Sequence, residues 1–409
     1  MAQNENPGNS APSPRPPQTW LTRGVLGIGF TSLFSDWGHE IATALLPTLL
    51  AGLGAPAAAL GLVEGVADGL SSFAKAVGGW LADRPALRRP IGVIGYSLTG
   101  LSTFAFGFVQ VWPQVLGARA VGWMGRGIRG PSRDVLMADA VPPQSLGRAF
   151  GFERAMDTLG AVLGPLTAMF LVSTMSVAQA MRWTLIPGTL AAFCFGTLAP
   201  RAVQHAAHAA RPAGFLASFR GLPPGFVRFM AAVFLFGLGD FAPTLLILRA
   251  AALLAPSHGA VAAATYSIAL YTFHNICYAL CSFPAGALAD RGNKRGLLAA
   301  SYLLAAATFA GFWFVSASVL GLGLLFGVAG VCVAAHETLE KALAADLLPR
   351  ESRGSGFGAL ATAKGIGDFF SSSLVGILWS AVSPAAGFAY AAVFTAAGGT
   401  LLLTARLRD

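Results

Sequence analysis

Long apolar stretches recur along the whole chain, and they constrain its fold more than any other feature of the sequence. A helix needs about 20 mostly apolar residues to cross the hydrocarbon core of a bilayer. Twelve stretches approach or exceed that length: 22–52, 57–80, 91–110, 113–138, 148–172, 180–199, 227–254, 261–288, 296–315, 318–345, 354–379 and 385–405. A helix satisfies its backbone polar groups internally, so these stretches predict an all-α membrane protein with twelve transmembrane helices.

Charged residues are scarce. They make up 11% of the 409 residues, whereas soluble domains carry about 25%, so this chain cannot cover itself with a charged surface. The N-terminal segment is rich in Pro, Ser and Asn and lacks a basic start followed by an apolar core, so no cleavable signal peptide is predicted. We expect residues 1–20 to form a disordered cytoplasmic tail.

Lys and Arg are distributed unevenly between alternate loops. With both termini in the cytoplasm, the segments on that side hold 17 basic residues and the opposite loops hold Arg182 alone. The 17 are Arg15, Arg23, Arg84, Arg88, Arg89, Arg148, Arg201, Arg211, Arg220, Arg228, Arg291, Lys294, Arg295, Arg350, Arg353, Arg406 and Arg408. Cytoplasmic loops of membrane proteins carry such an excess, so the distribution predicts cytoplasmic termini and an even number of spans. The net charge of +9 therefore indicates topology and contact with anionic lipid head groups, and no nucleic-acid binding is expected.

A constant offset of 207 residues relates the two halves of the sequence. It places Gly79, Asp83, Arg84, Asp139, Pro142, Gly147, Gly151 and Gly160 on Gly286, Asp290, Arg291, Asp346, Pro349, Gly354, Gly358 and Gly367. One offset across two separated regions predicts a duplicated six-helix unit. We expect an N-terminal half at 21–200, a cytoplasmic linker at 201–225 and a C-terminal half at 226–409, related as parallel repeats about an axis along the membrane normal.

Each half has a short charged loop after its second span. Gly79-Trp80-Leu81-Ala82-Asp83-Arg84 is followed by Arg88 and Arg89, and Gly286-Ala287-Leu288-Ala289-Asp290-Arg291 is followed by Lys294 and Arg295. These loops resemble the signature loop of the major facilitator superfamily; the first copy departs from it through Pro85 and one extra residue before the basic pair. The resemblance implies a conformational latch that stabilises an outward-open state. Its expected members are Gly79, Asp83, Arg84, Gly286, Asp290 and Arg291, with Arg133, Asp134, Glu340 and Lys341 as gate pairs at the cytoplasmic end.

The fifth span carries Gly151, Gly160, Gly164 and Pro165. This spacing resembles the glycine-proline motif of proton-coupled antiporters in the same superfamily, although Ala168 and Met169 replace two closing glycines. Glycines let helices approach closely, and proline bends the segment. The resemblance implies export, with ordinary packing of small residues as the alternative.

Ionisable residues gather on the first, fourth, seventh and tenth spans, which line the central cavity in the superfamily. Charged groups inside a bilayer are costly and face a bundle interior or a water-filled cavity. We therefore predict a substrate and proton pathway that includes Asp36, His39, Glu40, Arg119, Arg126, Arg129, Asp157, Asp240, His336 and Glu337. The four arginines of the fourth span, which include Arg133, are spaced 7, 3 and 4 apart and share one helix face. Asp36, Glu40 and Asp240 are the candidate proton carriers, with structural ion pairs as the alternative.

Two motifs imitate those of other protein classes. Gly125-Arg126-Gly127-Ile128-Arg129-Gly130 reads G-x-G-x-x-G, but a dinucleotide site requires a preceding strand and a β-α-β unit. The run from His336 to Glu340 has Glu where the H-E-x-x-H metalloprotease motif has its second His. His39-Glu40 and His336-Glu337 could together hold a transported metal ion, and we expect no resident metal or other cofactor.

The sequence predicts a secondary active transporter and not an enzyme. It contains no Walker A pattern and no complete catalytic set, so we expect ion gradients to drive the two halves between alternating states. The preferred function is proton-coupled export of a small organic solute by a monomer in the inner membrane. The alternative is uptake or symport of an anionic metabolite held by the arginine face. The expected partners are the solute, protons and the lipid bilayer.

Overall fold

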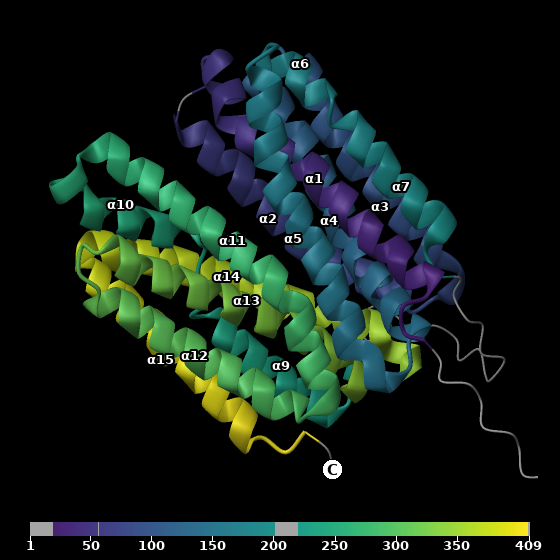
Figure 1. The fold of residues 1–409 in the computed structure, drawn as a ribbon. Helices are drawn as coiled ribbons and strands as arrows, with labels where there is room; N and C mark the ends of the chain where they lie inside the picture. The colour runs from purple at the N-terminus through teal and green to yellow at the C-terminus, as the bar shows by residue number, and fades with distance from the viewer. Residues whose placement is uncertain (1–18, 56, 201–219, 408–409) are drawn as a thin grey trace, which may run out of the picture.

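The computed structural model describes residues 19–55, 57–200 and 220–407, and in these residues it is built of α-helices joined by short loops (Figure 1). The first half contains α1 (Arg23–Gly52), α2 (Ala57–Ala82), α3 (Pro85–Ala105), α4 (Trp112–Ala140), α5 (Leu146–Val172), α6 (Val177–Arg182) and α7 (Leu185–Leu198). The second contains α9 (Pro224–Gly237), α10 (Thr244–His258), α11 (Ala260–Arg291), α12 (Lys294–Phe314), α13 (Val319–Leu347), α14 (Arg353–Ala381) and α15 (Pro384–Thr404). The expected tail and most of the expected linker lie outside the described residues.

Each of the twelve predicted spans corresponds to a helix or to a pair of helices. The largest difference at a helix end is in α3, which begins at Pro85 and not at 91. Proline suits the first turn of a helix because its missing N–H would have no partner there. The helix therefore continues past the apolar residues and includes the basic pair Arg88 and Arg89, which the sequence analysis had assigned to a loop.

Two predicted spans are interrupted. The span at 180–199 is divided into α6 and α7, and the span at 227–254 into α9 and α10. In the second break, Gly239 lies so close to α15 that a Cβ there would be 2.5 Å from the carbonyl oxygen of Ala391. Ser372 of α14 accepts a hydrogen bond at 3.0 Å from the amide of Ala242, and Pro243 then precedes α10. Neighbouring helices thus satisfy the interrupted backbone, as a bilayer requires.

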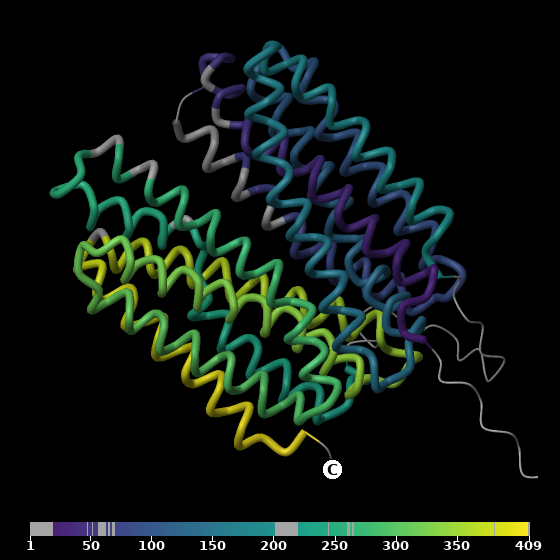
Figure 2. The backbone as a smooth tube through the Cα atoms, viewed as in Figure 1, coloured from purple at the N-terminus to yellow at the C-terminus, as the bar shows by residue number. Residues whose placement is uncertain are grey.

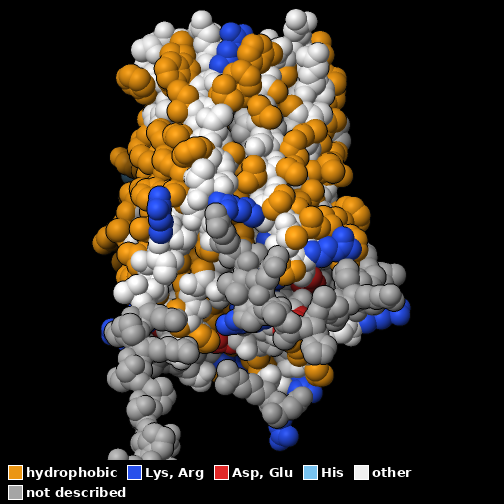
Figure 3. All heavy atoms as spheres, turned by 90° about the vertical axis from the view of Figure 1, so that its right-hand side faces the viewer, with side chains coloured by type: hydrophobic (Ala, Val, Ile, Leu, Met, Phe, Trp, Pro, Cys, Tyr) orange, Lys and Arg blue, Asp and Glu red, His pale blue; other side chains and the backbone are white. Residues whose placement is uncertain are grey.

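The outer surface is suited to lipid. Five of the described helical segments are long and apolar enough to cross a membrane by length and composition: Pro85–Phe108, Pro143–Val172, Lys294–Phe314, Val319–Leu347 and Pro384–Thr404. Figure 3 shows apolar side chains over much of one face, with Lys and Arg concentrated toward its lower part. Exposed residues such as Phe170, Leu280 and Phe314 would be unfavourable in water but are stable against acyl chains.

The two halves form separate bundles that lie close together at one end and diverge toward the other (Figure 2). We call the end at which α1 begins and α15 ends the terminal end, and the opposite end the distal end. The main contacts between the bundles are those of α5 with α11 and of α2 with α14. Most of the predicted pathway residues lie on α1, α4 and α13, and Asp240 lies in the break between α9 and α10.

Candidate functional site

An ion pair joins α1 to α4 inside the first half. Arg126 Nη2 lies 2.8 Å from Asp36 Oδ1. Glu40 follows Asp36 by one helical turn and therefore shares its face, and His39 Nε2 lies 3.8 Å from Glu40 Oε1. The guanidinium balances the charge of a carboxylate that lies about midway along its helix, where a lone charge would be costly.

The other arginines of the predicted face of α4 are engaged within the first half. Arg119 stacks on Trp123, with its guanidinium carbon 3.8 Å from the ring centroid. Arg129 stacks in the same way on Tyr96 of α3, at 3.9 Å. Both arginines are buried, whereas the side chain of Arg126 is 32% exposed. Arg126 is therefore the arginine of the predicted pathway that a solute can reach in this conformation.

A second charged cluster surrounds Lys364 of α14. Its Nζ lies 2.6 Å from Glu337 Oε1, 3.6 Å from Glu340 Oε2 and 4.0 Å from Asp240 Oδ2. Asp240 occupies the break between α9 and α10, and His336 Nε2 lies 4.0 Å from the same Asp240 oxygen. The structure thus brings together Asp240, His336 and Glu337 of the predicted pathway, around a lysine that the prediction did not assign to it.

One ion pair of this cluster crosses between the halves. Arg154 of α5 lies 3.3 Å from Glu337 Oε2 of α13 and 2.8 Å from Asp157 Oδ2 on its own helix. Asp157 is therefore linked through Arg154 to the second-half cluster. Arg154 also interacts electrostatically with Tyr278 of α11.

A second crossing lies nearer the terminal end. Lys341 of α13 is 3.4 Å from Asp134 of α4 and 3.7 Å from Glu153 of α5. Arg133 shares both carboxylates, at 3.1 Å from Asp134 and 2.6 Å from Glu153. These four residues connect three helices of the two halves, and a gate role for Arg133 and Asp134 stays a prediction.

The two charged loops reach across the interface in opposite directions. Asp83, after α2, accepts a hydrogen bond at 3.0 Å from the amide of Ser355 at the start of α14, and another from the Ser355 hydroxyl. Asp290, in the last turn of α11, accepts bonds from the amides of Gly147 and Arg148 at 2.7 and 2.9 Å and from Arg148 Nε at 3.0 Å. Each aspartate therefore caps the N-terminus of a helix in the other half. Burial raises the pKa of Asp83, and the hydrogen bonds from Ser355 oppose that rise.

The basic residues of the loops make different contacts. Arg84 stacks on a tryptophan of α2 at 4.5 Å, and Arg291 is exposed. Arg88 Nη1 lies 2.8 Å from Asp139 Oδ2, and Arg353 of the other half lies 2.6 Å from the second oxygen of the same carboxylate. Asp139 is thus held by one arginine from each half, a contact that the sequence analysis did not predict.

The glycines of α5 face two different partners. A Cβ on Gly151 would lie 2.5 Å from a carbonyl oxygen of α11, so this glycine permits contact between the halves. A Cβ on Gly160 would lie 2.4 Å from a carbonyl oxygen of α1, and one on Gly164 would lie 2.4 Å from the Cβ of Glu40. Pro165 lies inside the helix. Gly160 and Gly164 therefore fix the distance from α5 to the face of α1 that bears Asp36 and Glu40.

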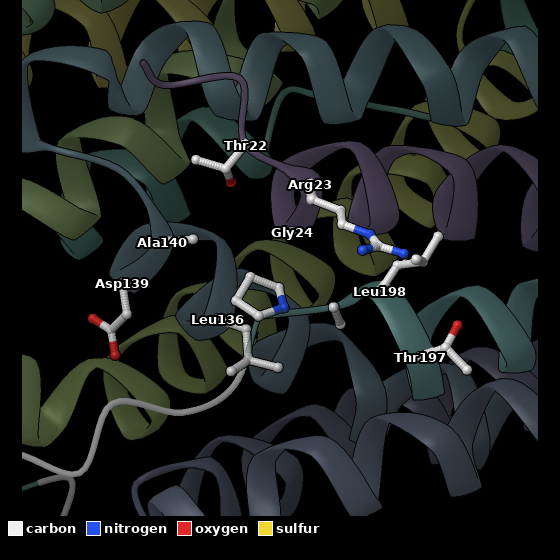
Figure 4. Close-up of a pocket in the computed structure, with 10 residues that line it drawn as sticks. Thr22, Arg23, Gly24, Leu136, Asp139, Ala140, Thr197 and Leu198 are labelled. Atoms are coloured by element: carbon white, nitrogen blue, oxygen red, sulfur yellow. The ribbon is translucent and has the colours of Figure 1, made fainter. Parts of the chain in front are cut away.

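A pocket of about 520 Å³ opens at the terminal end, between the start of α1 and the ends of α4 and α7 (Figure 4). In this view Arg23 and Thr197 lie on one side and Asp139 on the other. No residue of the predicted solute pathway lines it. We therefore place the candidate site at the two charged clusters, one around Asp36 and Arg126 in the first half and one around Lys364, and not in this pocket.

Sequence reasoning missed the polar face of α11. Tyr271, Asn275 and Tyr278 are spaced 4 and 3 apart, the helical repeat that could have revealed them in an otherwise apolar span. The His-Glu pairs at 39–40 and 336–337 lie in different halves. Within the described residues, no group of three or more His, Cys, Asp or Glu side chains is placed to hold a metal ion.

Two helical bundles with charged residues on their facing helices define a membrane transporter. The sequence model of the Major Facilitator Superfamily matches residues 28–273 and 229–409, and the chain belongs to this superfamily. An uncharacterized MFS-type transporter of Methanocaldococcus jannaschii is 28% identical over 386 residues, covering 94% of this chain and 95% of that protein.

Solved structures share the fold. The proton:xylose symporter XylE matches with a TM-score of 0.75 at 13% identity, over 93% of this chain and 94% of that one. The transporter FucP in its outward conformation matches with a TM-score of 0.74 at 15% identity, over 94% and 98%. The predicted family and fold class, twelve transmembrane helices in two pseudo-symmetric six-helix halves, are therefore confirmed. The chain is a multi-pass membrane transporter.

Proposed function

We propose that this protein is a proton-coupled exporter of a small organic solute. It works as a monomer in the inner membrane, with both termini in the cytoplasm, and exposes one site alternately to the two sides. The observation that carries this proposal is the Asp36–Arg126 pair at 2.8 Å, with Glu40 one turn away. A carboxylate at this depth is stable either beside a cation or with a bound proton, because desolvation disfavours a lone charge. Exchange between those two conditions couples proton movement to solute movement.

The contacts at the terminal end support a second part of the proposal. With the terminal end in the cytoplasm, the loop aspartates, the Arg353–Asp139 pair and Lys341 hold the cytoplasmic side closed. This conformation is then outward-open, and the contacts form the latch. Transport to the inward-open state requires all of them to break.

The alternative, uptake of an anionic metabolite, has less support from the geometry. It depended on an arginine face, but Arg119 and Arg129 are buried against aromatic rings. Only Arg126 of these three is accessible, and it is already paired with Asp36. Transport of a metal ion is supported less still, because within the described residues no group of three or more His, Cys, Asp or Glu side chains is placed to hold one.

The test is the variant Asp36→Asn in proteoliposomes, with a solute chosen by a ligand-stabilisation screen of the purified protein. We expect accumulation driven by a pH gradient to be lost, while counterflow exchange without a gradient continues. Arg126→Ala should weaken both activities, because it leaves a buried carboxylate without its partner, a change that costs about 3–5 kcal/mol in buried pairs. Glu351→Gln, an exposed change outside the bundles, is the matched control. If Asp36→Asn still concentrates solute, Asp36 is not the proton carrier and Asp240 is the next candidate.

A further inference from the structure

The accessible charge between the halves is predominantly negative. In the two clusters, the side chains exposed by more than a fifth are those of Arg126 at 32%, Glu40 at 27%, Glu337 at 25% and Asp240 at 22%. One accessible guanidinium therefore stands against three accessible carboxylates. Partly exposed charges midway along membrane helices must face water and not lipid, so these groups belong to the pathway.

Glu40 is the carboxylate of this set without a strong cationic partner. Asp36 is bound to Arg126, while Asp240 and Glu337 both lie within 4.0 Å of Lys364. Within the described part of the chain, the basic group that lies within 4.0 Å of Glu40 is the imidazole of His39, at 3.8 Å. A Cβ on Gly164 would lie 2.4 Å from the Cβ of Glu40, so α5 packs closely against α1 at this residue.

The second half presents an aromatic and polar surface toward this carboxylate. Tyr271 and Asn275 are one turn apart on α11 and share a helix face, and Tyr271 is near enough to Glu40 and Asp36 for the charges of these carboxylates to affect its hydroxyl. At 1.5 Å per residue, Glu40 lies about 18 Å from the distal end of α1, and Tyr271 lies about 17 Å from the distal end of α11. Counted from the distal ends of their helices, the two residues therefore lie at similar depths in opposite halves.

We propose that Glu40, Tyr271 and Asn275 form a binding subsite for the ammonium group of an organic amine. The carboxylate balances the charge, the amide and phenol oxygens accept N–H donors, and the aromatic ring attracts a cation. An arginine-bound anion would have to displace Asp36 from Arg126 and pass three accessible carboxylates. This subsite rests on the proposed transport function, and it specifies the solute as a cation.

The experiment compares three ligands of similar shape and different charge with the purified full-length protein, by isothermal titration calorimetry. They are 2-phenylethylamine, which is cationic at neutral pH, 3-phenylpropanol, which is neutral, and 3-phenylpropionate, which is anionic. We expect the amine to bind at least tenfold more tightly than the other two. Glu40→Gln should weaken amine binding by at least tenfold and Tyr271→Phe by less, because the ring is retained.

Two further variants keep the test decisive. Glu40→Asp preserves the charge and should retain part of the affinity that Glu40→Gln loses, which a purely structural role would not explain. Glu351→Gln should bind like the unsubstituted protein. Failure of the amine to bind, tighter binding of the propionate, or unchanged amine binding in a folded Glu40→Gln protein would each overturn the assignment. Because binding is measured without a gradient, this outcome is independent of the flux test on Asp36→Asn.

Discussion

Asp83 and Asp290 occupy equivalent loops, yet the residues that hold them differ in charge. Arg148 and Ser355 are equivalent in the 207-residue repeat, so a guanidinium supports Asp290 where a hydroxyl supports Asp83. Burial raises the pKa of Asp83. A protonated Asp83 therefore stabilises the closed terminal end relative to a conformation in which this side chain is solvated. That contribution is present below the ordinary pKa of about 3.9 and is lost as the pH rises through the raised value.

We therefore expect Asp290→Asn to open the terminal end more than Asp83→Asn does. Asparagine resembles a protonated Asp83, whereas at 290 it removes the anion beside Arg148. Hydrogen bonds to charged groups contribute about 1.5–3 kcal/mol. Asp290→Asn should therefore shift the conformational equilibrium roughly 10- to 150-fold, and Asp83→Asn should shift it less than about tenfold.

Spin labels at Ser173 and Ala317, in the distal loops of the two halves, would measure this shift as a shorter distance between the labels. Arg148→Ala should reproduce most of the effect of Asp290→Asn and add little to it in the double variant. Equal shifts for the two aspartate variants would contradict the asymmetry.

Sequence reasoning found individual charged residues better than it found their partners. Asp36 and Arg126 both belong to the pathway that the sequence predicts, and the structure pairs them. Lys341 and Asp134 both belong to the predicted gate pairs, and the structure places them 3.4 Å apart. The crossing Arg154–Glu337 joins residues far apart in the chain, so no local pattern reveals it. The roles of all these residues in transport stay predictions.

At the scale of elements, glycine contacts determine how closely the halves can meet. A Cβ on Gly286 of α11 would lie 2.0 Å from the carbonyl oxygen of Gly147, and one on Gly147 would lie 2.2 Å from that of Gly286. On the other side of the interface, a Cβ on Gly79 would lie 2.5 Å from the carbonyl oxygen of Gly354. The obstacle in each case is backbone, which can move only if a whole helix moves.

Gly286→Ala should therefore prevent the terminal end from closing. We expect the protein to fold, to favour the conformation that is open at this end, and to lose most of its transport, because one of the two alternating states becomes inaccessible. Gly117→Ala is the matched control, since a Cβ at Gly117 would meet nothing within 4 Å. The same pair of spin labels reports the outcome, and closure comparable to that of the unsubstituted protein would show that the helices can adapt.

Helix positions could be predicted because hydropathy records contact with lipid, but the interruptions could not. The span at 227–254 is apolar apart from Arg228, Asp240, Thr244 and Arg249. Its break follows from contacts with Ala391 and Ser372 on other helices. These contacts are made with other helices, so the periodicity of residues within the span does not predict them. The break nevertheless affects the site, because Asp240 lies in it, with its Oδ2 4.0 Å from Lys364 Nζ.

At the scale of the whole molecule, the described polar contacts between the halves are concentrated toward the terminal end. Among the described residues, the polar contacts that cross the interface run from Arg154–Glu337 toward the loop aspartates at the terminal end. The repeat predicted that two equivalent loops exist but not that each would cap a helix of the opposite half. That exchange requires the two halves to be docked, and the sequence of either half alone does not specify the docking.

The side of the membrane on which this closed end lies decides whether the conformation is outward-open. Basic residues are retained in the cytoplasm during insertion, and the 13 described members of the set of 17, among them Arg84 and Arg291, lie in the helix ends and loops of the terminal end. In a variant lacking Cys194, Cys277, Cys281 and Cys332, we would place single cysteines at Glu351 and Ala317, which are exposed in the loops before α14 and α13. A membrane-impermeant maleimide should label Ala317→Cys in intact cells, and Glu351→Cys only after the cells are permeabilised. Labelling of Glu351→Cys from outside would reverse the topology, and the conformation described above would then be inward-open.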